Sequence, residues 1–447
     1  MKENLLFEHY DEIERKLQVK NAVLFYKVTK TFNMSCCHIA AFKYIERCFT
    51  MVIETESFNE LEFSLICKIL DSSCLNVDSE VEVFDAVIKW FNFNVEERSK
   101  FARQLLLKVR LNLLSEPALR HLKDKSSCVS MNGDCVETFS KILSTRLSHD
   151  KSIFHKKYRQ CNQSKFNVLI CGGRILSSKE AVRDMKELDV NNLTKVNSFA
   201  TLATEKYNIE VIFVKGEIYS FGGLNIDQKL VKTVEKYSLV TKTWSYVCDL
   251  YDKRKSFSVC RFMSDVYVMG GIVKKNAIDF CYKLNTENSV FKQVARMNEA
   301  RLRTASAVFD ENIVVSGGLS QNDNRLNTVE LYNVFADTWT PMPRMTHERF
   351  NHSLVVSKSK LFVFGGCAHK INCEFYDKIS NKFIQIESPN FQSFALKPVL
   401  IENKIFVFPW FTNRVLTYDV IKNKWAKELC EATKDLISYS LVKLPLY

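Results

Sequence analysis

Four basic residues recur at one fixed distance before a pair of glycines, and they are the first candidates for a chemical role. Each stands 16 residues before the first glycine of its pair: Lys206, Arg254, Arg301 and Arg349. Two residues after each of them come Asn208, Ser256, Arg303 and Asn351. Guanidinium groups bind carboxylates through two parallel hydrogen bonds, so we predict that these eight residues form a rim that binds an acidic peptide. The alternative is solvated charge at loop ends, with a recurrence that the repeat imposes for structural reasons.

The segments that follow the glycine pairs are the second candidate for partner binding. They differ in sequence: LNIDQKL, IVKKNAID, LSQNDNRLN and CAHKINC. Different loops on a shared frame suit partner selection. Ordinary solvated turns are an equally good explanation.

One group of side chains has metal-binding types, namely Cys367, His369 and Cys373, with His347 or His352 as further candidates. A structural zinc needs four ligands at recognisable spacing, and no Cys-x-x-Cys pair occurs in the chain. We therefore interpret these as incidental loop residues and predict no metal and no cofactor. The motifs GxGxxG, GxxxxGK[ST], GxSxG and HExxH are absent, which indicates a protein that is not an enzyme. A propeller enzyme with a site built from distant loops is the least favoured alternative.

Length and charge narrow the classes of partner. A chain of 447 residues favours two or three domains. Its 63 basic and 51 acidic residues give a net charge of +12, which permits an acidic partner without requiring nucleic acid. No apolar run approaches the roughly 20 residues of a membrane span, and the N-terminus has no signal-peptide pattern. The 15 cysteines are then expected to be reduced thiols, so we predict a cytoplasmic protein, with the cytoskeleton or nucleus as alternatives.

Glycine is scarce, with 12 residues in the chain, yet it recurs in pairs. The five pairs are Gly172-Gly173, Gly222-Gly223, Gly270-Gly271, Gly317-Gly318 and Gly365-Gly366, and Pro409-Trp410 stands where a sixth is expected. A period near 48 residues with about four short strand patterns per unit is typical of a β-propeller, here with six blades. Each pair should lie where no Cβ fits. The aromatic residues Trp244, Trp339 and Trp425 are predicted to pack between blades.

The ends of the repeat region predict how the ring closes. The first unit opens with KFNVLICGG and lacks the strand that precedes the other pairs, whereas ISYSLVKLPLY at the C-terminus is a spare strand. We predict that this C-terminal strand completes the first blade and so removes an exposed sheet edge. The sixth blade should be distorted but present.

Before the repeats, the pattern is helical. In VDSEVEVFDAVIKWF, for example, apolar residues recur at three- and four-residue steps. We therefore predict a multidomain fold: an N-terminal extension (1–20), an α-helical domain (21–147), a polar linker (148–165) and an all-β propeller of six blades (166–447).

The repeated unit of apolar strand, Gly-Gly, Glu-x-Tyr and Trp resembles the kelch repeat. The stretches AAFKYIERCF, SFNELEFSLICKIL and KVRLNLLSEPAL are similar to the BACK domain of the kelch-like family. This resemblance implies a non-enzymatic interaction protein, similar to the substrate-recognition adaptors of cullin-RING ubiquitin ligases, with actin binding as the alternative. Family members also carry an N-terminal BTB domain that recruits cullin. Residues 1–20 are too few for one, so we expect a BTB remnant there and a cullin partner only if a BTB domain exists upstream.

Overall fold

The computed structural model describes residues 17–77, 80–111, 114, 119–120, 122, 166–190, 192–357, 360–366, 372–389, 395–401, 404–410, 414–429, 433 and 436–445. The chain divides into two compact units, Met1–Ser164 with Pro445–Tyr447, and Lys165–Leu444. The predicted linker, 148–165, lies outside the described residues, as does most of the N-terminal extension.

The first unit is helical. Its helices in the described part of the chain are α2 (Ala22–Thr31), α3 (Ser35–Arg47), α4 (Phe49–Val52), α5 (Glu56–Asn59), α6 (Phe63–Asp71), α7 (Glu80–Phe93), α8 (Val95–Arg98), the 3-10 helix η1 (Ser99–Phe101) and α9 (Ala102–Leu106). Helix α7 buries Val81, Phe84, Val87 and Phe91, which are apolar residues of the predicted helical pattern. No helix of the described residues is both long and apolar enough to pass through a lipid bilayer.

Short helix ends in this unit are fixed by specific polar contacts. The side chain of Asn94 accepts a hydrogen bond from the backbone N–H of Glu97 at 3.2 Å and so caps the start of α8. The Arg98 guanidinium lies 4.1 Å from the centre of the Trp90 ring, and Trp90 Nε1 donates to Leu61 O at 2.9 Å. The contact of Arg98 holds α8 against α7, and the hydrogen bond to Leu61 connects α7 to the segment before α6.

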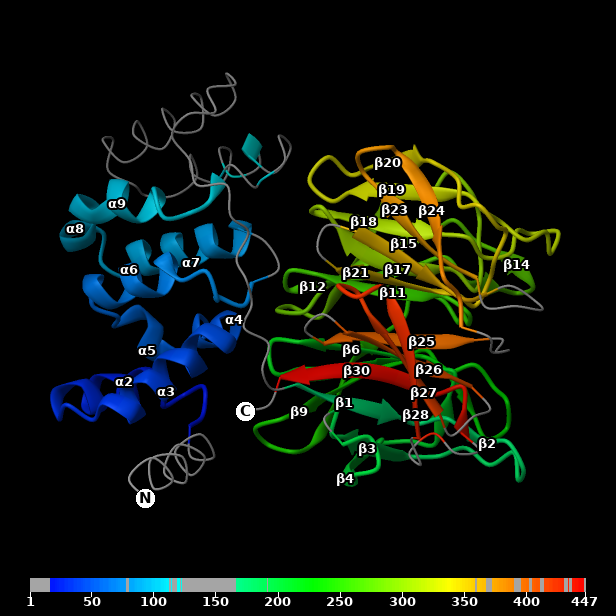
Figure 1. Ribbon diagram of the computed structural model, residues 1–447, viewed down its shortest axis with the longest axis horizontal. Coiled ribbons are helices and arrows are strands. Elements are labelled where there is room, and N and C mark those ends of the chain that lie inside the picture. The colour runs from blue at the N-terminus through cyan, green and yellow to red at the C-terminus, as the bar shows by residue number, and fades with distance from the viewer. Residues whose placement is uncertain are drawn as a thin grey trace. The chain divides into compact units, whose positions relative to one another are not determined.

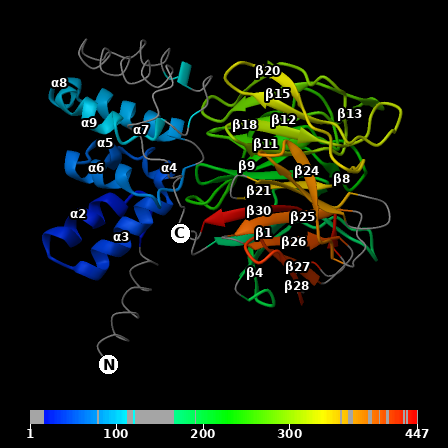
Figure 2. The same ribbon diagram turned by 45° about the horizontal axis from the view of Figure 1, so that its top comes forward.

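The second unit is a propeller of six four-stranded antiparallel sheets (Figures 1 and 2). Blade 1 is β30 (Ser440–Pro445), β1 (Phe166–Cys171), β3 (Asp184–Leu188) and β4 (Val196–Thr201). Blade 2 is β6 (Glu210–Val214), β7 (Glu217–Phe221), β9 (Thr233–Ser238) and β10 (Trp244–Asp249), and blade 3 is β11 (Ser258–Phe262), β12 (Asp265–Met269), β15 (Cys281–Asn285) and β16 (Val290–Val294). Blade 4 is β17 (Ala305–Phe309), β18 (Asn312–Ser316), β19 (Val329–Asn333) and β20 (Thr338–Met342). Blade 5 is β21 (Ser353–Ser357), β22 (Lys360–Phe364), β23 (Cys373–Asp377) and β24 (Lys382–Ile386), and blade 6 is β25 (Leu396–Ile401), β26 (Lys404–Pro409), β27 (Arg414–Asp419) and β28 (Lys424–Leu429).

The predicted closure of the ring is confirmed. In Figure 1 the C-terminal strand β30, drawn in red, lies beside β1, and the sheet order of blade 1 is β30-β1-β3-β4. The backbone N–H of Val211 in blade 2 donates to Ser440 Oγ at 3.2 Å, which also connects this last strand to the next blade. The first and last parts of the propeller sequence therefore share one sheet.

Blade 6 has all four strands, although proline and tryptophan replace its glycines. Pro409 is the last residue of β26 and lies opposite Leu396. Proline, which has no backbone N–H to donate, is tolerated at such a strand end. The Trp410 backbone N–H donates to Ala395 O at 3.2 Å, and its ring packs on a cluster that includes Val168 and Tyr439 of blade 1. The sixth blade is thus a regular sheet, with an aromatic ring at the place of the second glycine.

Apolar clusters fill the spaces between successive blades. The cluster between blades 1 and 2, for example, joins Leu169 and Met185 to Val211 and Ile218. The three tryptophans lie at such junctions, and each donates its indole N–H to a carbonyl near the end of the preceding blade: Trp244 to Thr201 at 2.7 Å, Trp339 to Ala295 at 2.9 Å and Trp425 to Glu387 at 2.7 Å. An aromatic ring and one directed hydrogen bond therefore hold each of these pairs of blades in register.

Candidate partner-binding face of the propeller

The glycine pairs lie where two backbone segments approach each other closely. In blade 4, a Cβ on Gly317 would lie 2.5 Å from Arg349 O of the next blade, and one on Gly318 would lie 2.6 Å from Leu302 O of the same blade. Both glycines have positive φ, +54° and +101°. The first glycine thus leaves room for the backbone that enters the next blade. The second leaves room for the backbone that enters its own blade.

Two names describe this part of the ring. The lead-in segments are the residues just before the first strand of a blade: 206–208, 254–256, 301–303 and 349–351. Because the first two strands of a blade are antiparallel, the lead-in segments lie at the same end as the glycine pairs and the loops that follow them. We call this end of the ring the Gly-Gly face.

The four predicted basic residues are buried below this face. Lys206, Arg301 and Arg349 have 0% exposed surface and Arg254 has 1%. Each arginine donates from Nη1 to the carbonyl of the first glycine in its own blade: Arg254 to Gly270 at 3.1 Å, Arg301 to Gly317 at 2.8 Å and Arg349 to Gly365 at 2.6 Å. These side chains tie the lead-in segment to the glycine pair.

Each buried base is also paired with an acid near it. Lys206 Nζ lies 2.6 Å from Glu235 Oε2, Arg301 Nη2 lies 2.6 Å from Glu330 Oε1 and Arg349 Nη2 lies 2.6 Å from Glu374 Oε1. In blade 3, Tyr282 stands where the others have glutamate; Arg254 lies 4.9 Å from its ring centre and pairs with Asp252 instead. Burial outweighs the attraction of Glu235 and lowers the pKa of Lys206.

The blades that lack the base also lack the acid that pairs with it. Blade 1 has Leu436 at the position of the base. Lys186 stands at the position of the acid, because it lies opposite Ile170 as Glu330 lies opposite Val315, so the ion pair is lost in this blade. Blade 6 has Leu416 at the position of the acid and Ser393 in place of the base. A base is therefore present only where its own blade supplies an acid or an aromatic ring.

The prediction that Lys206, Arg254, Arg301 and Arg349 bind a partner is corrected by these observations. Their charges are already paired and no part of their surface is available, because the repeat uses them to hold each blade together. The glutamates that pair with them were not predicted as partners. The signal was present in the sequence, since Glu235, Glu330 and Glu374 each stand two residues before the repeated tyrosine.

The other four predicted residues do reach the Gly-Gly face. Asn208 and Arg303 are exposed, and Ser256 and Asn351 are partly exposed. All four have positive φ, between +52° and +58°, as does Ser438 in blade 1. Backbone hydrogen bonds link them from blade to blade: Asn208 N to Ser438 O at 3.1 Å, Arg303 N to Ser256 O at 2.8 Å and Asn351 N to Arg303 O at 3.0 Å. The left-handed backbone costs about 1 kcal/mol or more at a non-glycine residue, and these bonds hold it in place.

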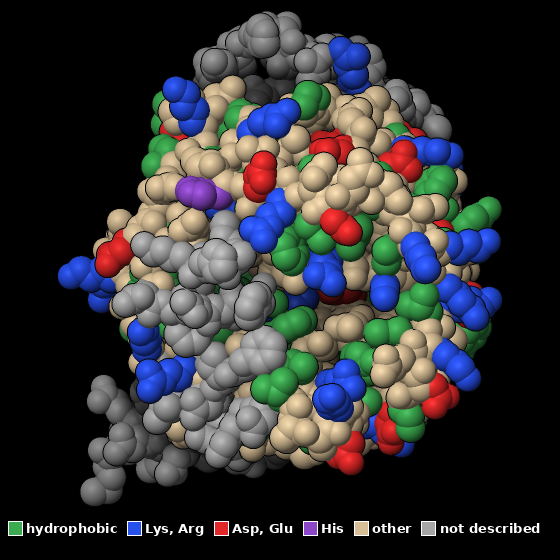
Figure 3. All heavy atoms as spheres, turned by 90° about the vertical axis from the view of Figure 1, so that its right-hand side faces the viewer, with side chains coloured by type: hydrophobic (Ala, Val, Ile, Leu, Met, Phe, Trp, Pro, Cys, Tyr) green, Lys and Arg blue, Asp and Glu red, His purple; other side chains and the backbone are tan. Residues whose placement is uncertain are grey.

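The Gly-Gly face is basic. Figure 3 shows the side of the molecule that carries β2 (Arg174–Ile175), β8 (Leu224–Asn225) and β14 (Asn276–Ala277), and Lys and Arg side chains gather there around a hollow. Within the described residues, no carboxylate lies within ion-pair distance of six of its cations: Arg174, Lys255, Lys274, Lys275, Arg303 and Arg325. Unpaired positive charge of this kind attracts an acidic ligand.

Two of these cations lie near the same aromatic ring. The Arg303 guanidinium lies 5.7 Å and the Arg325 guanidinium 5.5 Å from the centre of the Phe350 ring. Arg303 and Phe350 come from successive lead-in segments, and Arg325 comes from the loop after Gly318. Three segments of two blades thus meet at this point of the face.

Loops of adjacent blades are also connected on the Gly-Gly face. Gln321 Nε2 of blade 4 donates to Asn276 Oδ1 of blade 3 at 3.0 Å, and the Ala277 backbone N–H donates to Gln321 Oε1. The loops that follow these two glycine pairs therefore support each other. The fourth predicted loop, CAHKINC, falls mainly on residues outside the described part.

The metal-ligand candidates are not brought together by the described residues. Cys367 and His369 lie outside the described residues, and His352 Nε2 is 2.7 Å from Ser316 Oγ in the interior. His347 contacts Thr346 and Gln385, and burial raises the pKa of the Cys373 thiol to about 12. No group of three metal-ligating side chains forms among the residues that are described.

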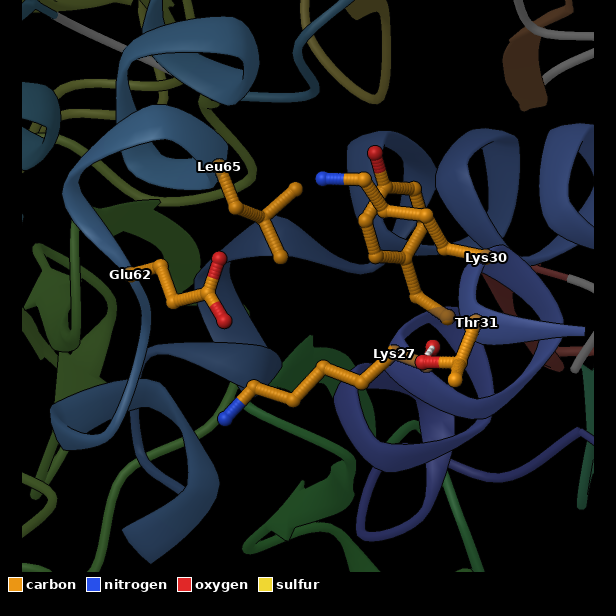
Figure 4. A pocket seen from close by; sticks show the side chains of 6 residues that line it. Lys27, Lys30, Thr31, Glu62 and Leu65 are labelled. Atoms are coloured by element: carbon orange, nitrogen blue, oxygen red, sulfur yellow. Dashed lines mark hydrogen bonds between the residues drawn. The ribbon is translucent and has the colours of Figure 1, made fainter.

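The helical unit has a pocket of its own, of about 300 Å³, between α2 and α6. Its lining residues are Tyr26, Lys27, Lys30, Thr31, Glu62 and Leu65. Figure 4 shows the carboxylate of Glu62, the residue before α6, and the side chain of Leu65 in α6 pointing toward α2. Lys27 Nζ donates to Glu60 O at 3.1 Å, so this lysine is held at the pocket margin.

Comparison with known proteins agrees with this architecture. Residues 22–123 match the BACK family, "BTB And C-terminal Kelch", and residues 158–366 match the "KLHDC2/KLHL20/DRC7 Kelch-repeats domain". Kelch-like protein 28 of Homo sapiens is 25% identical over 266 residues, which cover 58% of this chain and 47% of that protein. Kelch-like protein 7 of Rattus norvegicus is 22% identical over 397 residues, covering 86% of this chain and 66% of that protein.

A third relative, Kelch-like protein 11 of Homo sapiens, is 26% identical over 279 residues, covering 58% of this chain and 37% of that protein. The chain spans about half the length of the first of these relatives, 47% of Kelch-like protein 28. The helical unit and the propeller are both accounted for by these matches. The chain is thus a BACK-domain and kelch-repeat protein, homologous to the kelch-like proteins.

Proposed function

We propose that this protein is a non-enzymatic adaptor whose propeller binds an acidic segment of a partner protein on the Gly-Gly face. The observation that carries the proposal is the set of cations on this face that no described acid pairs, beside backbone positions held at positive φ. Strained backbone that the surrounding structure holds in place is typical of binding sites. The residues for contact are Asn208, Ser256, Arg303 and Asn351 together with the loops, and no longer the four buried bases.

By analogy with the kelch-like relatives, the bound partner would be the substrate of a cullin-RING ubiquitin ligase. Cullin would be recruited only through a BTB domain. Actin is the alternative partner from the same class of interaction proteins. Sedimentation with actin filaments at low and high salt distinguishes it from a soluble substrate.

The test compares two triple variants of equal charge change. Lys255, Arg303 and Arg325 are changed to Glu on the Gly-Gly face, and Lys242, Lys382 and Lys422 are changed to Glu at the other end of the blades, where the third strand turns into the fourth. Proteins captured from cells by the unchanged chain are identified by quantitative mass spectrometry. We expect the true partners to be lost from the first variant and retained by the second. Equal retention by both variants would contradict the proposal.

A further inference from the structure

The two arginines that share the Phe350 ring indicate what kind of acidic group the face recognises. Resting on the proposed function of the Gly-Gly face, we propose that Arg303 and Arg325 form a clamp for a phosphorylated side chain of the partner protein. Both guanidiniums lie within 6 Å of the centre of the Phe350 ring. The clamp is therefore a specificity-determining element of the partner site.

The charges at this point favour a dianion. Both guanidiniums lie within 6 Å of one ring centre, at 5.7 Å and 5.5 Å, so the two positive charges are at most about 11 Å apart, the sum of these distances. No described carboxylate pairs with either of them; Asp323 shares the loop of Arg325 without forming an ion pair with it. This differs from the buried bases of the same blades, which all have acids beside them. A phosphomonoester carries about −1.5 to −2 charges at pH 7, whereas one carboxylate balances only one arginine.

The donor geometry also fits phosphate. Each guanidinium presents a planar fork of N–H donors, and a phosphate group has three acceptor oxygens that two forks can share. An apolar ring beside each guanidinium excludes part of its water, which strengthens its interaction with an anion. A single carboxylate would use one fork and leave the second arginine without a ligand.

The backbone at the clamp is fixed before any ligand arrives. Arg303 donates its N–H to Ser256 O at 2.8 Å and accepts from Asn351 N at 3.0 Å, while Phe350 N donates to Gly366 O at 3.2 Å. Arg325 pairs with Leu319 across its own loop. Because these positions are already ordered, binding loses less conformational entropy than it would at a mobile loop.

The experiment uses the full chain and three fluorescent peptide pools of identical random flanking sequence. The central residue is phosphoserine in the first pool, serine in the second and glutamate in the third. Binding is followed by fluorescence polarisation at fixed salt. We expect the phosphoserine pool to bind about tenfold more tightly than the glutamate pool, and the serine pool to bind weakest.

Three variants test the residues. Arg303→Gln and Arg325→Gln should each weaken phosphoserine binding by about tenfold, and Arg303→Lys should restore little of it, because lysine lacks the planar fork. Lys382→Gln is the matched control, since Lys382 is an exposed cation at the start of β24, at the other end of the blades from the Gly-Gly face; it should change binding by less than about threefold. Arg303 and Arg325 are both exposed, so the thermal unfolding midpoint should not change in these variants.

Several results would overturn the inference. Equal binding of the phosphoserine and glutamate pools, with loss in both arginine variants, removes the phosphate clamp but leaves an acidic-partner site. Phosphoserine binding that survives both arginine variants places the phosphate elsewhere. Binding of no pool above background also rejects the clamp, and the capture experiment then decides the proposed function separately. Competition by inorganic phosphate alone at the peptide concentration would indicate an anion site without a peptide.

Discussion

Arg301 and Glu330 form an ion pair inside blade 4, with Arg301 Nη2 and Glu330 Oε1 2.6 Å apart and the two side chains 0% and 4% exposed. The residues are 29 positions apart in the chain, on the lead-in segment and on the third strand. Glu330 also accepts from the backbone and side-chain N–H groups of Asn298, both at 2.7 Å. Arg301 also donates to Gly317 O. Its guanidinium therefore connects the lead-in segment, the glycine pair and the acidic residue of the repeat.

The first prediction concerns this pair. Arg301→Leu should lower the free energy of unfolding by about 3–5 kcal/mol, because Glu330 is left buried without its cation. The double variant Arg301→Leu with Glu330→Met replaces the ion pair by two apolar side chains and should recover much of this loss. Urea unfolding of the full chain and the two variants measures both effects. A double variant that is as unstable as Arg301→Leu would refute the pairing argument.

The glycine pairs lead to a second prediction. Gly317→Ala adds a Cβ 2.5 Å from Arg349 O at a φ of +54°, so it should lower the unfolding free energy by more than about 2 kcal/mol. Gly216→Ala in the turn between β6 and β7 is the control, because Gly216 also has positive φ, +82°, and should lose about 1 kcal/mol. The difference between the two in thermal unfolding measures the crowding alone. If both variants lose a similar unfolding free energy, the positive φ alone would explain why glycine is required in the pairs, and the crowding argument would be wrong.

A third prediction concerns pH. Burial, with the charges of Arg349 and Arg301, holds the pKa of His352 well below its usual value of 6.5. The unfolded chain takes up a proton near pH 6.5 while folded His352 stays neutral, so the unfolded state binds more protons. Stability should therefore fall as pH drops below about 6.5, by up to about 1.4 kcal/mol per pH unit.

His352→Gln removes the titration and keeps a polar partner for Ser316 Oγ. Unfolding free energies between pH 7.5 and 5.5 should fall less steeply in this variant than in the unchanged chain. Parallel pH profiles would rule out His352 as the group responsible. The comparison is informative because the variant retains both neighbouring arginine pairs.

Ring closure gives a fourth prediction. Ending the chain at Ser438 removes β30, exposes the edge of β1 and takes the buried side chain of Val442 out of the cluster between blades 1 and 2. We expect loss of cooperative unfolding and a tendency to aggregate. The control is a permuted chain in which residues 436–447 precede Phe166, since this supplies the same strand from the other end. Cooperative unfolding of the truncated chain, or failure of the permuted one, would show that closure works differently.

The parts of this fold that depend on spacing were predictable from the sequence. The ladder of glycine pairs predicted the blades, and a spare C-terminal strand beside an incomplete first unit predicted the closure. The role of Arg254, Arg301 and Arg349 was not predictable from recurrence alone, because a structural ion pair and a binding rim both repeat once per blade. The distinguishing signal was the change in blade 1, where base and acid are lost together.

The cluster around Phe350 could not be predicted, for a different reason. Arg303, Arg325 and Phe350 occupy unequal positions in the repeat and come together only once the loop after Gly318 folds back over the lead-in segments. Contacts that arise from one loop conformation leave no periodic trace in the sequence. The ligand preference of the Gly-Gly face therefore depends on loop conformations that differ between blades, whereas the blades themselves repeat.

The strand pairing of blade 1 has a consequence for how the propeller forms during synthesis. Strand β1 is made at the start of the propeller sequence, at Phe166, whereas its neighbour β30 begins only at Ser440. A ribosome adding about 5–20 residues per second leaves the edge of β1 unpaired for tens of seconds while the other five blades emerge. The nascent chain must keep this edge from pairing with other proteins throughout that interval, because the ring can close only after β30 has been made.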